Sequence, residues 1–196
     1  MASPDTLVRL NETHVEPAAE TLAQAFHEYP VFTYVIPDEQ ERKENLPALF
    51  RAFMKYGLIN GEAYATSGGM EGITVWLPPG FGGGLSGDPG IGREALDRFA
   101  YYGGCVYSAR KNHAPARHWF LELIGVAPES QGKGYAGNLL KPVLERIERE
   151  GLPCYLDTEL PENVMLYEHF GFKVVDDIMI PGTEIRSWGM LRKSKD

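Results

Sequence analysis

One stretch of this 196-residue chain constrains the fold more than any other. Residues 119–126 form an almost unbroken apolar run, which is typical of a strand buried on both faces of a sheet. A proline-containing, glycine-rich turn follows, and residues 135–150 then place apolar side chains at helical spacing. A second apolar run covers residues 154–157. The pattern predicts a β-α-β unit with a right-handed crossover.

The turn inside this unit is the first candidate site. Its residues 131–137 read Gln-Gly-Lys-Gly-Tyr-Ala-Gly and lead directly into the helix. Small residues at a helix start leave backbone N–H groups accessible, and the helix dipole favours negative charge there. We therefore expect a phosphorylated ligand to bind at this turn.

Two interpretations of the turn compete. Residues 132–137 match a G-x-G-x-x-G dinucleotide fingerprint, and Asp157 follows at the distance expected of a ribose-binding acid. In that fingerprint the first glycine follows the strand almost directly, whereas here residues 127–131 intervene. The spacing Gln131-x-x-Gly134-x-Ala136 instead resembles the pyrophosphate-binding signature of the GNAT superfamily, the acyl-CoA-dependent N-acetyltransferases.

A second motif strengthens this resemblance. Asn163 and Tyr167 lie four residues apart and precede Gly171-Phe172, as in the Asn-x-x-x-Tyr…Gly-Phe element of GNAT enzymes. The resemblance covers residues 119–193, where it is most similar to the puromycin N-acetyltransferases, and it is weak over the first hundred residues. A capping asparagine and a half-buried tyrosine are the structural alternative for the same two residues.

The resemblance implies a fold and a domain organisation. We expect an α/β (α+β) fold whose mixed central sheet has about six or seven strands flanked by helices. The sheet is expected to splay between the strands at 119–126 and 154–157, so that pantetheine lies between them. Residues 1–196 would form a single N-acetyltransferase domain, in which residues 1–118 shape the acceptor site and residues 119–196 bind acetyl-CoA.

It also implies site residues. Tyr167 is expected to be the general acid for the departing thiolate. Glu122, which interrupts the apolar strand, is the candidate general base, because a desolvated carboxylate has a raised pKa. The puromycin enzymes have a small residue at that place, and pairing of Glu122 with an Arg or Lys is the alternative. The expected cofactor-binding residues are Leu123, Ile124, Gly125, Val126, Gln131, Gly132, Lys133, Gly134, Tyr135, Ala136, Gly137, Asn163 and Tyr167.

Composition narrows the function further. The net charge of −8 argues against nucleic acid or an acidic membrane surface as a partner and favours a cationic amine.

Location, metal content and oligomeric state are also predicted from the sequence. Residues 1–15 carry no apolar signal-peptide core, and two cysteines are too few for a disulfide framework, so we expect a cytoplasmic location. The histidines and cysteines lack metal-ligand spacing, which predicts no metal site. A homodimer is a reasonable expectation.

The sequence therefore predicts transfer of an acetyl group from acetyl-CoA to a primary amine of a small molecule, directly and through a tetrahedral intermediate. An acyl-CoA-binding regulatory module without robust catalysis and a protein or peptide N-acetyltransferase remain alternatives.

Periodicity and turn residues give the remaining elements. Residues 31–36 are expected to form an aromatic-rich connection, and residues 78–92, with seven glycines, a mobile surface loop. Strands are expected at 7–10, 62–66, 73–77, 172–180 and 184–192, and helices at 17–26, 40–58, 93–102 and 162–170.

Overall fold

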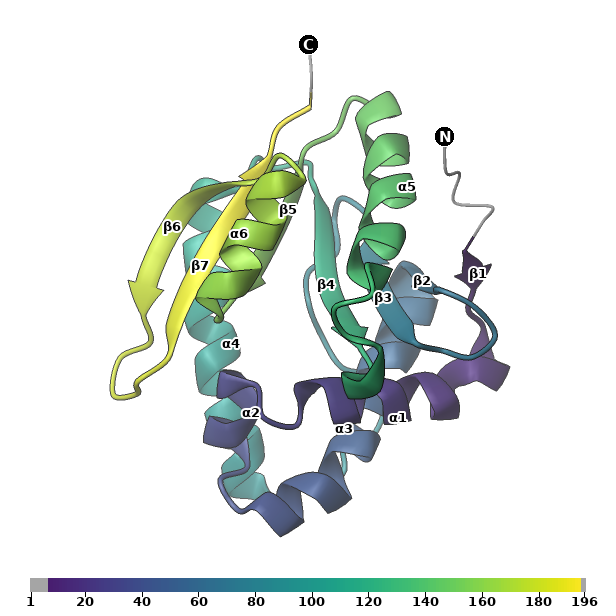
Figure 1. Cartoon of the computed structure of the whole chain (residues 1–196). Coiled ribbons are helices and arrows are strands. Elements are labelled where there is room, and N and C mark those ends of the chain that lie inside the picture. Colours follow the sequence, from purple (N-terminus) through teal and green to yellow (C-terminus); the bar gives the residue numbers. More distant parts are fainter. Residues whose placement is uncertain (1–6, 195–196) are drawn as a thin grey trace.

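One seven-stranded sheet runs through the computed structural model, which describes residues 7–194 (Figure 1). Its strand order is β1-β2-β3-β4-β5-β7-β6, and only the β4–β5 pair is parallel. The expected mixed sheet is confirmed, whereas a doubly wound parallel sheet, which the dinucleotide interpretation needs, is not formed. The strands are β1 (Val8–Arg9), β2 (Glu62–Ala65), β3 (Gly72–Leu77), β4 (Trp119–Val126), β5 (Cys154–Thr158), β6 (Lys173–Met179) and β7 (Arg186–Arg192).

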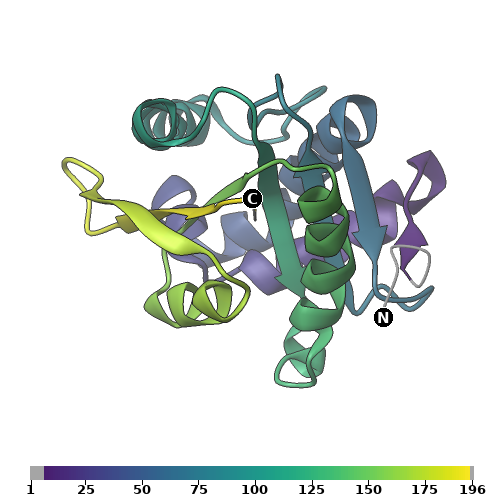
Figure 2. The same cartoon turned by 90° about the horizontal axis from the view of Figure 1, so that it is seen from above.

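Helices cover both faces of the sheet. In Figure 2, α5 and α6 lie on one side of it, and α3 and α4 lie on the other. The buried side chains follow the same division, since one large cluster joins α1 to α4 with the sheet and a second joins α5 and α6 with it. The described helices are α1 (Val15–Phe26), α2 (Pro30–Val35), α3 (Glu39–Asn60), α4 (Arg93–His113), α5 (Tyr135–Arg149) and α6 (Pro161–His169), with 3₁₀ turns at Glu12–His14 and Pro128–Ser130.

The central strand β4 carries an irregularity that positions the site. On the neighbouring strand, Val75 pairs with Leu123 but Trp76 pairs with Leu121, so Glu122 is the extra residue of a β-bulge. The bulge breaks the alternation of side chains at this point of the strand. Glu122 and Leu123 consequently both lie on the face of α3 and α4.

β4 and β5 pair over a very short length. Their register joins only Trp119 with Cys154 and Phe120 with Tyr155. Beyond these two pairs the strands diverge, as Figure 1 shows. The predicted splay is therefore present, and it leaves the second half of β4 without a strand neighbour on the β5 side.

Two segments differ from the sequence prediction. The expected aromatic connection is wrong, because Pro30 at the first helical position presets the backbone and α2 buries Val31, Phe32 and Val35. The helix expected at 93–102 continues to His113. The sequence hid this extension because the Gly103–Gly104 pair has low helix propensity, which tertiary packing overrides.

No helix of the described residues is long and apolar enough to cross a membrane. The start of the segment 1–15, where no signal-peptide core is expected, lies outside the described residues.

Candidate active site

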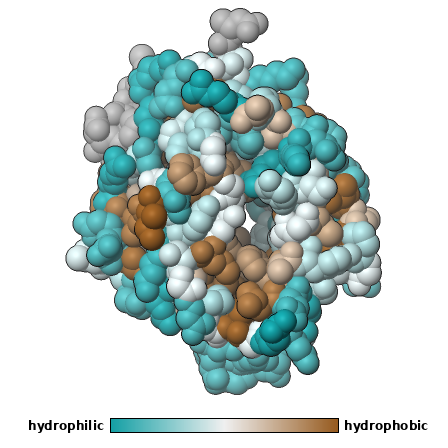
Figure 3. All heavy atoms as spheres, turned by 180° about the vertical axis from the view of Figure 1, so that it is seen from behind, coloured by the Kyte–Doolittle hydropathy of each residue, from teal (hydrophilic) through white to brown (hydrophobic). Residues whose placement is uncertain are grey.

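The divergence of β4 and β5 opens into a cavity of about 890 Å³. The cavity is lined by β4, by the turn before α5, by α6, and by side chains from α1, α2 and α4. Seen from behind, the molecule is hollowed near its centre, with hydrophobic residues beside the hollow (Figure 3). A single cavity thus connects the turn before α5 with the split in the sheet.

The turn before α5 presents backbone to this cavity. Gly132 and Gly134 have φ angles of 74° and 83°, a region that residues with a Cβ rarely adopt. A Cβ at either position would meet nothing within 4 Å, so the space beside the turn is open. Gly134 is the N-cap of α5, and the first-turn N–H groups that follow it have no carbonyl partner within the helix. The geometry suits a phosphate group held by main-chain donors.

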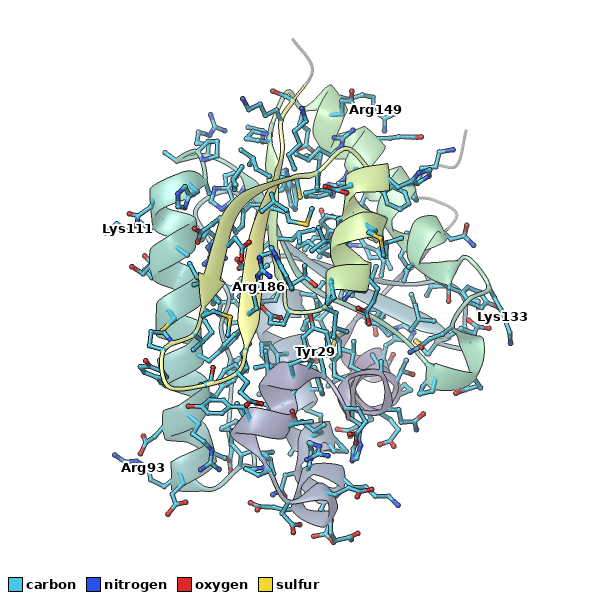
Figure 4. All side chains as sticks on the ribbon, turned by 60° about the vertical axis from the view of Figure 1, so that its left-hand side comes forward. Tyr29, Arg93, Lys111, Lys133, Arg149 and Arg186 are labelled. Carbon is cyan, nitrogen blue, oxygen red and sulfur yellow. The ribbon has the colours of Figure 1, made fainter. Side chains whose placement is uncertain are left out.

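The polar side chains of the turn are directed to its own backbone. Gln131 Nε2 donates to the Val126 carbonyl at 3.2 Å, and Lys133 Nζ donates to the Glu129 carbonyl at 2.8 Å. Lys133 extends from the edge of the molecule in Figure 4 and is the one sequence-predicted site residue that does not line the cavity. The others line it: Glu122, Leu123, Ile124, Gly125, Val126, Gln131, Gly132, Gly134, Tyr135, Ala136, Gly137, Asn163 and Tyr167.

Helix α6 brings its two predicted residues to the opposite wall. Pro161 begins the helix, and Asn163 and Tyr167 share one face because they are four residues apart. Tyr167 is 5% exposed and packs edge-on against Phe172 at 5.9 Å between ring centroids. Burial raises the pKa of the Tyr167 hydroxyl, with Glu159 and Cys154 adding to the rise. The phenol therefore stays protonated and can donate a proton.

Glu122 projects from the β4 bulge toward α4. Burial raises the pKa of its carboxyl from 4.5 to about 7, against the opposing effects of Arg110 and of a hydrogen bond from the Gly84 backbone. A group with this pKa exchanges its proton readily near neutral pH. Arg110 is itself buried and lies 4.0 Å from the ring centroid of Phe120.

Two acidic residues that the sequence analysis did not select as site residues lie at the end of β5. Burial raises the pKa of Asp157 well above its usual value, and the neighbouring Glu159 raises it further, whereas Arg110 and Tyr155 lower it. Burial also raises the pKa of Glu159. Both residues line the cavity, together with Arg110. Asp157 had been considered only as a ribose-binding residue.

A hydrogen-bond network fixes this end of the strand. Glu159 Oε1 accepts from the Tyr102 hydroxyl at 2.6 Å and from Ser187 Oγ at 2.7 Å. The Glu159 backbone N–H donates to the Tyr29 hydroxyl at 3.0 Å. Tyr29 lies near the middle of the molecule in Figure 4 and also lines the cavity. Tyr29 and Tyr102 lie more than 50 residues from Glu159 in the sequence, so no local pattern indicates these contacts and Glu159 was missed.

Among the described residues no group of three or more His, Cys, Asp or Glu side chains could hold a metal ion. A cavity at the split of the sheet, a glycine turn at a helix N-terminus and buried titratable groups beside them are the features expected of an acyltransferase.

Comparisons with known proteins show what the chain is similar to. Residues 90–172 match the model of the acetyltransferase (GNAT) family. An uncharacterized N-acetyltransferase of Schizosaccharomyces pombe is 29% identical over 84% of this chain and 72% of its own length. Residues 90–172 thus resemble the GNAT acetyltransferases, and a relative named as an N-acetyltransferase is similar to most of the chain.

Solved structures share the fold. One described as histone acetyltransferase HPA2 and related acetyltransferase, from Corynebacterium glutamicum, has a TM-score of 0.69 at 20% identity and covers 97% of both chains. Arylalkylamine N-acetyltransferase 2 from Aedes aegypti has a TM-score of 0.64 at 14% identity and covers 96% of this chain and 98% of its own. The GNAT-like architecture expected from the sequence is confirmed.

Proposed function

We propose that this protein transfers the acetyl group of acetyl-CoA to a primary amine of a small molecule. The observation that carries the proposal is the shared cavity, which joins the anion turn and the open edge of β4 to a pocket lined by carboxyl groups. An acetyl donor and a cationic acceptor would meet there. Residues 1–118 would shape the acceptor side and residues 119–196 the donor side.

On the donor side, backbone groups of the chain would do the binding. The N–H groups of Gly132, Gly134 and the first turn of α5 would hold the pyrophosphate. Main-chain groups of Ile124 and Val126, at the open edge of β4, would pair with the pantetheine amides. An N–H near Leu123 would stabilise the negative charge that develops on the carbonyl oxygen.

On the acceptor side, side chains would move the protons. Acetyl-CoA supplies an activated thioester carbonyl. Glu122 would accept a proton from the ammonium group, directly or through water, so that the free amine can form the C–N bond. As the C–S bond breaks, Tyr167 would donate its phenolic proton to the departing thiolate, and the second proton of the attacking nitrogen would return to the Tyr167 oxygen. Asn163 would contact the donor from the same face of α6.

The acceptor class rests on the carboxyl groups of the pocket. Glu122, Asp157 and Glu159 line it, and an ammonium group that enters would favour the ionised forms of these carboxyls, whose pKa values burial raises. The name of the mosquito relative, arylalkylamine N-acetyltransferase, supports an amine on a hydrophobic group, and aromatic side chains of α1, α2 and α4 line the cavity. Residues 119–193 also resemble the puromycin N-acetyltransferases, but puromycin itself is not proposed as the acceptor. The cytoplasm remains the proposed location, consistent with the free thiols of Cys105 and Cys154.

Thermal unfolding tests the donor first. The purified protein is heated alone, with acetyl-CoA, and with NAD. A ligand present at about a hundred times its dissociation constant stabilises a protein by about 2.7 kcal/mol. We expect a rise in Tm with acetyl-CoA and none with NAD. A rise with NAD alone would contradict the proposed donor.

A thiol-release assay then tests the acceptor. Acetyl-CoA is offered with 2-phenylethylamine, with tyramine, with an aliphatic diamine and with a lysine-containing peptide. We expect release with at least one small amine. Release with the peptide alone would favour protein acetylation, and binding of acetyl-CoA without release with any of them would favour a regulatory module.

A further inference from the structure

Three consecutive glycines of the loop 78–92 lie directly against the acceptor side of the site. A Cβ added at Gly83 would lie 2.6 Å from Glu122 Oε2, and one at Gly82 would lie 2.8 Å from Arg110 Nη2. A Cβ at Gly84 would lie 2.9 Å from the Tyr56 ring. The segment 82–84 therefore approaches these three side chains so closely that a Cβ at any of its residues would force its neighbour to move. The expected mobile surface loop is thus a close packing partner of Glu122.

The segment is attached to α3 at two points. The Tyr56 hydroxyl donates to the Gly82 carbonyl at 2.9 Å. The Ser86 backbone N–H donates to the Ala52 carbonyl at 3.0 Å. Because the two attachments flank Gly83 and Gly84, they fix the backbone that faces the Glu122 carboxylate.

We propose that Tyr56 is a positioning residue: by holding the Gly82 carbonyl it keeps the segment 82–84 over Glu122, where the segment orients the carboxylate and excludes water from it. The inference rests on the proposed role of Glu122 as the base. With this role, two further parts of the chain belong to the site: Tyr56 of α3, and the segment 82–84, whose three glycines carry no side chain. Neither touches the acceptor amine through a reactive group of its own.

The charged and titratable groups around Glu122 agree with this placement. Arg110 of α4 and the Gly84 backbone lower the pKa of Glu122, and burial raises it. Tyr56 has its own pKa raised by burial and by Glu122 and lowered by Arg110. Asp157 of β5 also interacts with Glu122, which raises the pKa of Asp157. Burial has the largest effect on Glu122, so release of the segment should lower its pKa.

Two variants test the proposal, each with a matched control. Tyr56→Phe removes the bond to Gly82, and Tyr101→Phe removes a similar hydroxyl-to-carbonyl bond, to Pro181 at 3.1 Å, outside the cavity lining. Gly83→Ala places a methyl group against Glu122, whereas Gly68→Ala meets nothing within 4 Å. Neither glycine has a positive φ, so the backbone of both tolerates alanine.

The first measurement is kinetic, with acetyl-CoA and the fastest amine of the acceptor screen. We expect kcat to fall about 10-fold in Tyr56→Phe and Gly83→Ala, because a misplaced base loses part of its contribution. KM for acetyl-CoA should stay within about twofold, since its site lies on the other wall. In the pH profile of kcat, the fall in activity at acid pH should occur at a lower pH in Tyr56→Phe than in the wild type.

The second measurement needs no acceptor. The Glu122 carboxyl has a folded pKa of about 7, above its ordinary 4.5, so its contribution to stability is complete below pH 4.5 and is lost as the pH rises to about 7. The difference in Tm between wild type and Glu122→Gln, followed from about pH 5 to about pH 8, isolates this contribution. In Tyr56→Phe the stability that protonated Glu122 contributes should be lost at a lower pH than in the wild type.

The outcomes distinguish the positioning role of Tyr56 from the proposed role of Glu122 as the base. If Tyr56→Phe and Gly83→Ala behave as Tyr101→Phe and Gly68→Ala in both measurements, the positioning role is overturned while the proposed base stands. Full kcat in Glu122→Gln would overturn the base itself, and the positioning role with it. If no amine in the screen reacts, the Tm comparison alone decides whether the segment shields Glu122.

Discussion

The two walls of the cavity are built in different ways. The wall proposed to bind the donor, called the donor wall, consists mainly of main-chain groups from one contiguous region, β4 through the start of α5, with α6 opposite. The wall proposed to bind the acceptor, called the acceptor wall, consists of side chains from α1, α2, α4 and the end of β5, together with the loop segment 82–84. A main-chain site needs only a backbone conformation, whereas a side-chain site needs particular atoms at particular places. The comparison predicts that substitutions on the two walls differ in both kind and size of effect.

The largest effect is expected for Tyr167→Phe. Removal of the phenolic proton should lower kcat by about 10²- to 10⁴-fold, the usual contribution of a positioned proton donor. Acetyl-CoA affinity, read from the rise in Tm, should hardly change. Unchanged turnover would remove Tyr167 from the mechanism and leave it as a packing partner of Phe172.

The second-largest effect is expected for Glu122→Gln. At saturating substrate near pH 8 the variant should lose about 10²-fold in kcat. In the wild type, activity should fall as the pH drops through about 7, because protonated Glu122 cannot accept a proton. The variant should not show this fall in activity, and a pH–rate profile of both proteins would test the difference. A fall that persists in the variant would assign it to another group.

Gly134→Ala tests the donor wall. Its φ of 83° should make alanine cost about 1–2 kcal/mol of stability. Gly182→Ala is the matched control, since Gly182 has a φ of 73° in a loop away from the cavity. Both variants should lower the Tm similarly, but only Gly134→Ala should also reduce the rise produced by acetyl-CoA. An equal rise in both would mean that the turn does not bind the donor.

The smallest effect is expected for Lys133→Ala. The amine donates to the Glu129 carbonyl and lies outside the cavity lining, so its loss should change acetyl-CoA affinity by about threefold or less. A titration of Tm against acetyl-CoA concentration would measure this. A tenfold loss would show that Lys133 moves onto the phosphates when the donor binds.

The donor wall could be predicted because its information is local. Gly132, Gly134 and the apolar strand before them lie within one short stretch, and backbone rules connect them directly to an anion site. The sheet followed from the same periodicities. The helix at Pro30–Val35 did not, because its formation depends on burial against α3 and α4 and not on its own pattern.

The acceptor wall could not be predicted because its residues come together only through contacts between distant parts of the chain. Tyr102 of α4 bonds to Glu159, and Arg110 of the same helix interacts with Asp157 of β5. No spacing in the sequence indicates these contacts. The segment 82–84 looked like an ordinary flexible loop, since glycines that avoid a clash and glycines that allow motion are identical in sequence. Glu122 was found because a carboxylate is conspicuous inside an apolar strand.

The short pairing of β4 with β5 also bears on how this protein avoids aggregation. A strand edge with free N–H and C=O groups normally recruits another chain, and proteins blunt such edges with charges, prolines or bulges. Here the open edge of β4 faces the interior, and residues 121–126 line the cavity instead of the rim of the sheet. A second protein would have to insert a strand into the cavity to pair with this edge. The fold thus leaves the backbone groups of β4 able to pair with a ligand inside the cavity, without exposing them at the rim of the sheet.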